Sequence, residues 1–169
     1  MSETIVKGEL GELPLILSLY EEARAFMAAA GNPTQWGLNR YPKEELLRED
    51  IEKERLYVLK RGGVICAAFV LFEGEEPTYR VIEEGGWSND KPYLTIHRLA
   101  SRTDEHGCAK AALDFARGYA KERGLVVRAD THEDNAPVRH ILEKYGFACC
   151  GIIHVANGSR RRAYLLDRD

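Results

Sequence analysis

The spacing of apolar residues predicts a short strand followed by two helices at the start of the chain. TIVKGE has the alternation of a strand, and from about residue 10 to 29 apolar side chains recur three or four positions apart, as on one face of a helix. Gly31-Asn32-Pro33 ends that helix. Pro42 followed by KEELLREDIEKE predicts a second, amphipathic helix with proline in its first turn.

The middle of the chain changes to a β-type pattern. RLYVLK and GVICAAFVLF are apolar and β-branched runs separated by Arg61-Gly62-Gly63, which indicates a hairpin. Residues 74–92 lack either periodicity and are expected to be irregular. YLTIHRLAS, which follows them, predicts another strand.

The second half alternates helices and strands. The stretch TDEHGCAKAALDFA at residues 103–116 begins a helix that ends at Gly124, and LVVRAD is the next strand. A helix over about 135–145 ends at Gly146, and FACCGIIHV and RRAYLLD then form a hairpin across Asn157-Gly158-Ser159. The apolar face of the first of these helices would contain Cys108, Ala112, Phe115, Ala116 and Tyr119.

The predicted order is β-α-α-β-β-β-α-β-α-β-β, which is an α/β fold. Its middle strand–helix–strand unit should be parallel, because a helical crossover joins parallel neighbours. The chain contains no internal repeat and no low-complexity linker, so residues 1–169 are expected to form a single domain.

Composition and charge restrict the class of protein. The net charge of -3 argues against a general nucleic-acid binder, which usually has a basic face. No segment approaches roughly 18 uninterrupted apolar residues, so we expect no membrane span. MSETIVKGEL does not have the apolar core of a signal peptide, so a cytoplasmic location with four reduced cysteines is expected. The histidines and cysteines do not have metal-ligand spacing, and no metal site is predicted.

The start of the helix after YLTIHRLAS carries small residues in a row. Small residues allow a ligand to approach the backbone, and the unpaired N–H groups of a helix start favour an anion. Two familiar phosphate-binding motifs are absent, because the sequence contains neither G-x-x-x-x-G-K-[ST] nor G-x-G-x-x-G.

A third motif fits this stretch. The pattern R/Q-x-x-G-x-G/A, after a strand and before a helix, is typical of the GNAT superfamily of N-acetyltransferases, and residues 104–109 (DEHGCA) match its glycine and its final small residue. LTIHRLAS resembles the family's fourth strand, and NAPVRHILEKYGF resembles its N-x-x-A-x-x-x-Y-E-K-x-G-F signature. The element order agrees over nearly the full length. The resemblance implies a GNAT-like mixed central sheet of about seven strands flanked by about four helices.

The resemblance also implies an acyltransferase that moves acetyl from acetyl-coenzyme A directly to a primary amine on a small molecule or a peptide. A homodimer would be unsurprising for the family. The family's cofactor contacts correspond here to amides that hold the pyrophosphate, to a backbone edge that pairs with the pantetheine arm, and to an asparagine on the other side of that arm. In the same order, these are His106, Gly107, Cys108, Ala109 and Lys110; Leu99, Ala100 and Ser101; and Asn135. The structural alternative is that Gly107 and Ala109 only permit close packing of helix on sheet.

Two positions depart from the family pattern. Asp104 replaces the usual arginine or glutamine, and Leu142 replaces the tyrosine that often protonates the thiolate. Tyr145 lies three positions further on and would have to be the substitute acid. Leu142 favours the alternative function, a catalytically inactive acyl-coenzyme A sensor or interaction module on the same fold.

Acetyl transfer needs a base for the amine, a proton for the thiolate and a donor to the thioester oxygen. The backbone N–H near Leu99 is the expected donor. His97 and His132 are the candidates for base or proton relay, and alternation would place His97 on the same face as Leu99. Asp130 either orients a histidine and contacts substrate, or is a structural turn or capping group. Each histidine is equally well interpreted as a hydrogen-bonded core residue.

Three further features allow a functional interpretation. Trp36, between the first two helices, would border the acceptor pocket or pack as part of a lid. Arg160–Arg162 suit a charged edge strand better than a site for an acidic acceptor. Cys108 at a helix start would have a lowered thiol pKa, which makes an acyl-cysteine route conceivable, although direct transfer is preferred.

Overall fold

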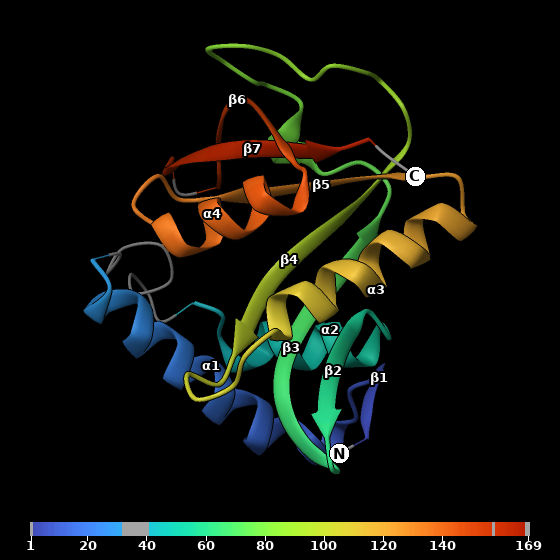
Figure 1. Cartoon of the computed structure of the whole chain (residues 1–169), viewed down its shortest axis with the longest axis vertical. Helices are drawn as coiled ribbons and strands as arrows, with labels where there is room; N and C mark the ends of the chain where they lie inside the picture. The colour runs from blue at the N-terminus through green and yellow to red at the C-terminus, as the bar shows by residue number, and fades with distance from the viewer. Residues whose placement is uncertain (1, 32–40, 157, 168–169) are drawn as a thin grey trace. The chain divides into compact units, whose positions relative to one another are not determined.

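The structure is a computed structural model that describes residues 2–31, 41–156 and 158–167 (Figure 1). Its element order is the predicted one, and the described chain contains seven strands and four α-helices. In chain order the elements are β1 (Glu3–Lys7), α1 (Leu13–Ala29), α2 (Glu44–Glu52), β2 (Leu56–Arg61), β3 (Val64–Glu73), β4 (Tyr93–Ser101), α3 (Cys108–Glu122), β5 (Val126–Thr131), α4 (Ala136–Tyr145), β6 (Ala148–His154) and β7 (Arg160–Leu166).

The strands follow the order β1-β2-β3-β4-β5-β7-β6, which confirms the predicted mixed α/β class. The chain divides into two compact units, one made of Met1–Leu71 and Arg98–Phe115 and the other of Phe72–His97 and Ala116–Asp169. Each unit combines two separate stretches of sequence. The expectation of a single domain over residues 1–169 stays a prediction.

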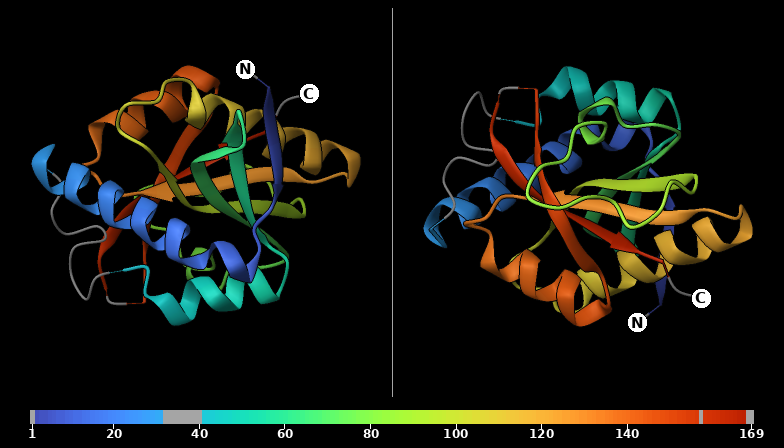
Figure 2. Two further views of the ribbon diagram at one scale, coloured as in Figure 1. Left: turned by 90° about the horizontal axis from the view of Figure 1, so that it is seen from below. Right: turned by 90° about the horizontal axis from the view of Figure 1, so that it is seen from above.

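The first unit is built on an antiparallel β1-β2-β3 arrangement. The turn between β2 and β3 uses Gly62 and Gly63 at φ 59° and 81°, a left-handed conformation that favours glycine, and this confirms the predicted hairpin. Helices α1 and α2 contact each other, as Figure 2 shows, and α1 buries the stripe Leu13, Ile16, Leu19, Tyr20 and Ala23.

Pro42 does not lie in the first turn of α2, contrary to the sequence prediction. The N-cap of α2 is Lys43 and the helix begins at Glu44, so the proline precedes the cap. The helix then buries Leu47, Asp50 and Ile51, and a carboxylate among these apolar residues requires partners.

The second unit contains the parallel pair and the C-terminal hairpin. Tyr93–Thr95 of β4 pairs with Val126–Arg128 of β5, which confirms the predicted parallel connection. Strand β7 pairs with both β5 and β6, so Arg160–Arg162 do not lie on an edge strand, contrary to expectation. The sequence did not reveal this because chain order places β6 before β7, whereas the sheet places β7 between β5 and β6.

The segment between β3 and β4 is more ordered than its composition indicates. It contains a short 3-10 helix at Pro77–Tyr79, and Glu83 forms an antiparallel bridge with Ile152 of β6. Gly85 at φ 151° passes so close to β6 that a Cβ atom would lie 2.2 Å from the carbonyl oxygen of Cys150. The buried Arg128 guanidinium lies 3.9 Å from the ring centroid of Trp87 and 4.1 Å from that of Tyr93, which anchors the segment by cation–π contacts.

None of the helices in the described parts of the chain is long and apolar enough to cross a bilayer.

Candidate active site

The loop between β4 and α3 is fixed at its first two residues, Arg102 and Thr103. The backbone N–H of Arg102 donates to the carbonyl of Cys66 at 2.9 Å, and its Nε donates to the carbonyl of Ile65 at 2.9 Å. The N–H of Thr103 donates to Glu22 of α1 at 2.7 Å. The loop therefore leaves the sheet from a defined position, as a binding loop requires.

Gly107 is the residue at which this loop becomes helix α3. It has φ 76°, and an added Cβ would meet only Nη2 of Arg61, at 3.7 Å, so glycine is required by the backbone and not by lack of space. The first helical hydrogen bond runs from Ala111 N–H to the Gly107 carbonyl at 3.0 Å. The N–H groups of Cys108, Ala109 and Lys110 precede that bond and have no intrahelical acceptor, which suits an anion.

Glu105 would repel an anion at this position, but other side chains hold its carboxylate. Nη1 of Arg61 donates to Oε2 at 3.0 Å, and the Cys66 thiol donates to Oε1 at 3.3 Å. These hydrogen bonds from Cys66 and Arg61 lower the pKa of Glu105, so the group is ionised and paired. Asp104 is exposed at the turn before it. The loop fits a pyrophosphate in its glycine and its amides, with Asp104 as the unfavourable charge.

Cys108 is unsuited to the acyl-cysteine route that its helix-start position suggested. It is buried, with 2% of its surface exposed, and burial raises the pKa of its thiol. The helix dipole favours the thiolate, but burial outweighs that effect because it penalises the charged form.

Strand β4 is not regularly extended between His97 and Leu99. Arg98 has φ 52°, which is left-handed and uncommon for a residue other than glycine. Alternation of side chains assumes a continuous extended strand. Alternation therefore does not predict on which faces of β4 the side chains of His97 and Leu99 lie.

In the second unit, Asp130 lies within β5 and is neither a turn residue nor a helix cap. Its side chain is 6% exposed, and Oδ2 accepts a 2.6 Å hydrogen bond from the hydroxyl of Tyr79. Nδ1 of His97 lies 4.0 Å from the same oxygen, and Nη1 of Arg161 lies 3.9 Å from Oδ1. A nearly enclosed carboxylate beside a histidine can stabilise the imidazolium that forms when the histidine takes a proton.

His97 itself is partly accessible. Its side chain is 22% exposed, and its ring packs edge-on against Phe72 with centroids 5.4 Å apart. The ring centroid of Tyr79 lies 6.3 Å from that of His97. His97 thus combines a packed position with a solvent-accessible part, as a general base requires.

His132 and Asn135 belong to the turn that leads into α4. Nδ1 of His132 accepts the N–H of Asp134 at 3.0 Å, so in the neutral ring the proton resides on Nε2. Oδ1 of Asn135 accepts the N–H of Val138 at 3.3 Å and caps α4. Contact of Asn135 with a pantetheine arm stays a prediction.

Leu142 and Tyr145 lie on α4. Leu142 is 4% exposed and forms part of the core. At the position where the family often has a tyrosine that acts as an acid, this chain therefore has a packing residue. Tyr145 is the last residue of the helix and is half-buried, with its ring centroid 6.1 Å from that of Phe147. Its role as an acid stays a prediction.

Comparison with known proteins identifies the family. A model of the Acetyltransferase (GNAT) family matches residues 17–147. The chain belongs to the GNAT acetyltransferase family. A GNAT-family acetyltransferase from Streptococcus agalactiae is 30% identical, with a TM-score of 0.84 over 99% of this chain and 96% of that chain.

Two other solved structures share the GNAT fold. A candidate acetyltransferase from Staphylococcus aureus is 27% identical, with a TM-score of 0.73 over 97% of this chain and 98% of that chain. A GNAT-family acetyltransferase from Listeria monocytogenes is 17% identical, with a TM-score of 0.72 over 97% and 95%, and at that identity it supports the fold alone. A search of curated proteins gives no match.

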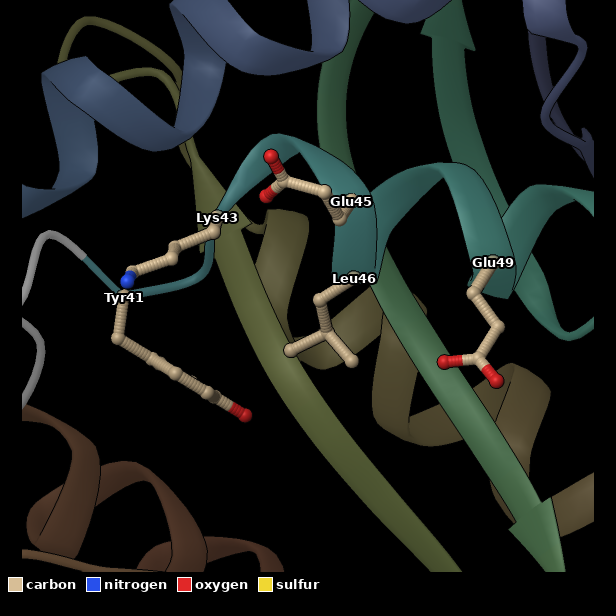
Figure 3. A pocket seen from close by; sticks show the side chains of 5 residues that line it. All are labelled: Tyr41, Lys43, Glu45, Leu46 and Glu49. Carbon is tan, nitrogen blue, oxygen red and sulfur yellow. The ribbon is translucent and has the colours of Figure 1, made fainter.

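This GNAT chain also has a surface pocket of about 330 Å³ in its first unit. Tyr41, Lys43, Glu45, Leu46 and Glu49 line it, most of them on α2 (Figure 3). Oε1 of Glu49 is paired with Lys53 at 2.8 Å. Trp36, the predicted acceptor contact, lies outside the described residues. Within the described ranges, no group of three or more histidine, cysteine or acidic side chains is arranged to hold a metal ion.

Three residues that contact the candidate site residues or their chain neighbours were not singled out from the sequence. Tyr79 lies in the irregular segment, and no local pattern indicated that its hydroxyl would bond Asp130. Arg61 was assigned only to a hairpin, yet its guanidinium lies beside Gly107. Asp50 was not singled out within the predicted amphipathic helix. Its exposed fraction is 0%, and only the spacing of this acid among the apolar positions of the helix could have indicated that.

Proposed function

We propose that this chain is an N-acetyltransferase that moves acetyl from acetyl-coenzyme A directly to a primary amine. The observation that carries the proposal is the loop before α3, where Gly107 at φ 76° opens onto unpaired helix N–H groups in a chain of the GNAT family. The acceptor is a small molecule or a peptide amine.

Acetyl-coenzyme A supplies an acetyl thioester and a pyrophosphate anchor. The amides of His106–Lys110 bind the pyrophosphate, because helix-start N–H groups favour negative charge. The backbone of Leu99–Ser101 pairs with the pantetheine arm as an added strand. The pairing of Glu105 with Arg61 supports this assignment, since it prevents a second acidic group from opposing the anion.

For the chemistry we assign His97 as general base. It removes the proton from the acceptor amine as the new C–N bond forms, and Asp130 stabilises the resulting imidazolium from 4.0 Å. The N–H of Leu99 donates to the thioester oxygen while charge collects there. As the C–S bond breaks, the thiolate takes a proton from Nε2 of His132, from Tyr145 or from water.

The alternative function is an acyl-coenzyme A sensor that performs no chemistry. Its support is Leu142, a buried packing residue at the position where the family often has an acidic tyrosine. The two functions share the cofactor site and differ in turnover.

The first experiment is thermal unfolding with acetyl-coenzyme A, coenzyme A and ATP. A ligand at about 100 times its dissociation constant adds roughly 2.7 kcal/mol to the free energy of unfolding. We expect a rise in Tm with both coenzyme A forms and little with ATP. No rise with either form would contradict both functions.

The loop is tested by Gly107→Trp. A large side chain at φ 76° both strains the backbone and occupies the approach to the α3 amides, so cofactor binding should be lost while the fold is retained. Far-ultraviolet circular dichroism checks the fold, and calorimetric titration with acetyl-coenzyme A checks binding. Retained affinity would show that the pyrophosphate does not bind at this loop.

Turnover separates the enzyme from the sensor. Release of the coenzyme A thiol is followed with spermidine, tryptamine, free amino acids and a peptide with a free N-terminus. We expect His97→Ala and His132→Ala to differ by at least an order of magnitude in kcat, since a base is needed in the step and a proton donor can be replaced by water. Cofactor binding without thiol release for any amine would support the sensor.

A further inference from the structure

Arg98 interrupts β4 with a left-handed backbone at φ 52°. A residue with a side chain keeps this conformation only where its surroundings over-determine it. The interruption stands immediately before Leu99, whose N–H is the donor in the proposed reaction, and the inference below rests on that proposed function.

The Arg98 side chain is held by a buried carboxylate. Nε donates to Oδ2 of Asp50 at 3.0 Å and Nη2 donates to Oδ1 at 3.1 Å. This bidentate pairing fixes the plane of the guanidinium group. The side chain of Asp50 is 0% exposed and that of Arg98 is 7% exposed. Arg55 donates a further 2.7 Å bond to Oδ1, so the carboxylate itself is fixed between two arginines.

The backbone of Arg98 is held as well. The hydroxyl of the fully buried Tyr20 on α1 donates to the Arg98 carbonyl at 2.5 Å. A third guanidinium nitrogen, Nη1, donates to the hydroxyl of Tyr41 at 2.6 Å. Side chain and carbonyl are thus both constrained, by residues from α1, α2 and the segment before α2.

The carbonyl of Arg98 and the N–H of Leu99 belong to the same planar peptide unit. A partner that fixes the direction of the carbonyl therefore also fixes the direction of the N–H, which points to the opposite side. A hydrogen bond to the carbonyl also polarises the amide and strengthens its N–H as a donor.

We propose that Tyr20, Asp50 and Arg98 are positioning residues that aim the Leu99 N–H at the thioester oxygen. None of them touches the reacting atoms in this assignment. Tyr20 acts on the peptide directly, and the Asp50–Arg98 pair keeps the left-handed turn that presents it.

The experiment compares Tyr20→Phe with wild type by amide NMR of Leu99, using acetyl-coenzyme A and coenzyme A as probes. In wild type the Leu99 amide proton should move further downfield with the acetylated form, because only that form carries the thioester oxygen. In Tyr20→Phe this acetyl-specific difference should become smaller while the dissociation constant for coenzyme A stays within about twofold, since the loop amides are untouched.

Kinetics with the best amine of the screen give a second measurement. Tyr20→Phe should lower kcat about tenfold with little change in the KM for acetyl-coenzyme A, a smaller loss than removal of an oxyanion donor. Tyr164→Phe is the matched control, because it also removes one hydrogen-bonded, buried hydroxyl, which donates to Glu143 at 2.8 Å. Its kcat should equal that of wild type.

Arg98→Lys is the second variant. It keeps the charge and loses the bidentate pairing with Asp50, and it should show a smaller acetyl-specific shift of the Leu99 amide proton. Wild-type kcat and an intact Leu99 shift in both variants would overturn the positioning role and leave the proposed function standing. Failure of the wild-type protein to bind acetyl-coenzyme A would instead remove the proposed function, and this inference with it.

Discussion

The hydroxyl of Tyr79 donates a 2.6 Å hydrogen bond to the carboxylate of Asp130, and both groups are almost enclosed by protein. Burial, together with the neighbouring Asp130 charge, raises the pKa of Tyr79 well above its ordinary value. The tyrosine therefore stays protonated and is a permanent donor to Asp130. This pair fixes the carboxylate that lies beside His97.

Tyr79→Phe should lower the free energy of unfolding by about 1–3 kcal/mol, because it leaves a buried carboxylate with one donor fewer. Urea unfolding followed by circular dichroism measures the change. Tyr119→Phe is the control, since the Tyr119 hydroxyl bonds the exposed Glu73. An equal loss of unfolding free energy in both variants would show that burial of the Tyr79–Asp130 pair does not increase the contribution of its hydrogen bond.

Gly107→Ala should destabilise the protein by about 1–2 kcal/mol, because an L-residue pays that amount for a left-handed backbone. Gly118→Ala in α3 is the matched control: the site is exposed, an added Cβ meets nothing within 4 Å, and alanine should gain about 1 kcal/mol there. Thermal unfolding of the two variants should therefore shift in opposite directions. Stabilisation by both would show that the loop does not need the left-handed conformation.

Asp104→Asn should tighten acetyl-coenzyme A binding about two- to fivefold at low salt, since it removes a like charge near the bound anion. The gain should shrink at 0.5 M salt, because exposed charges are screened there. Asp90→Asn makes the same change in net charge at an exposed residue outside the loop and should leave the dissociation constant unchanged. An equal gain in affinity in both variants would show that the effect comes from the net charge of the protein and not from the position of Asp104.

Thiol labelling tests the direct-transfer route. Burial raises the pKa of Cys66 and of Cys108, so at pH 8 both should react slowly with Ellman's reagent, whereas the exposed Cys149 should react first. Peptide mass spectrometry identifies the labelled residue. After incubation with acetyl-coenzyme A, Cys108 should carry no acetyl group, and an acetyl adduct there would favour a covalent route.

Alkaline pH should weaken the fold through buried tyrosines. Burial, with a contribution from Glu143, raises the pKa of Tyr164 to about 12, against about 10 in the unfolded chain. The folded state then binds the proton more tightly, so this contribution is fully present below pH 10 and is lost as the pH rises to 12. The urea midpoint should fall over that window, and the fall should be shallower in Tyr164→Phe. If the urea midpoint fell equally steeply with pH in wild type and in Tyr164→Phe, the assignment of this pH dependence to Tyr164 would be wrong.

Local pattern was enough to predict the elements of this fold. Apolar periodicity identified the helices and strands, and Gly62-Gly63 identified the hairpin because a left-handed turn selects glycine. The parallel β4–β5 pair followed from the intervening helix, since such a crossover admits few other arrangements. The glycine of the loop before α3 was also found, because its requirement is a property of one residue's backbone.

The sequence by itself thus determined element order, fold class, family resemblance and the glycine of the loop before α3, all of which depend on neighbours along the chain. Only the tertiary structure decided what depends on distant partners and burial. Asp50 and Arg98 are 48 positions apart, and Tyr79 and Asp130 are 51 apart, so no local pattern pairs them. The raised pKa of Cys108 and the inner place of β7 have the same origin. The free energy of a buried charge or thiol depends on what the folded chain packs around it.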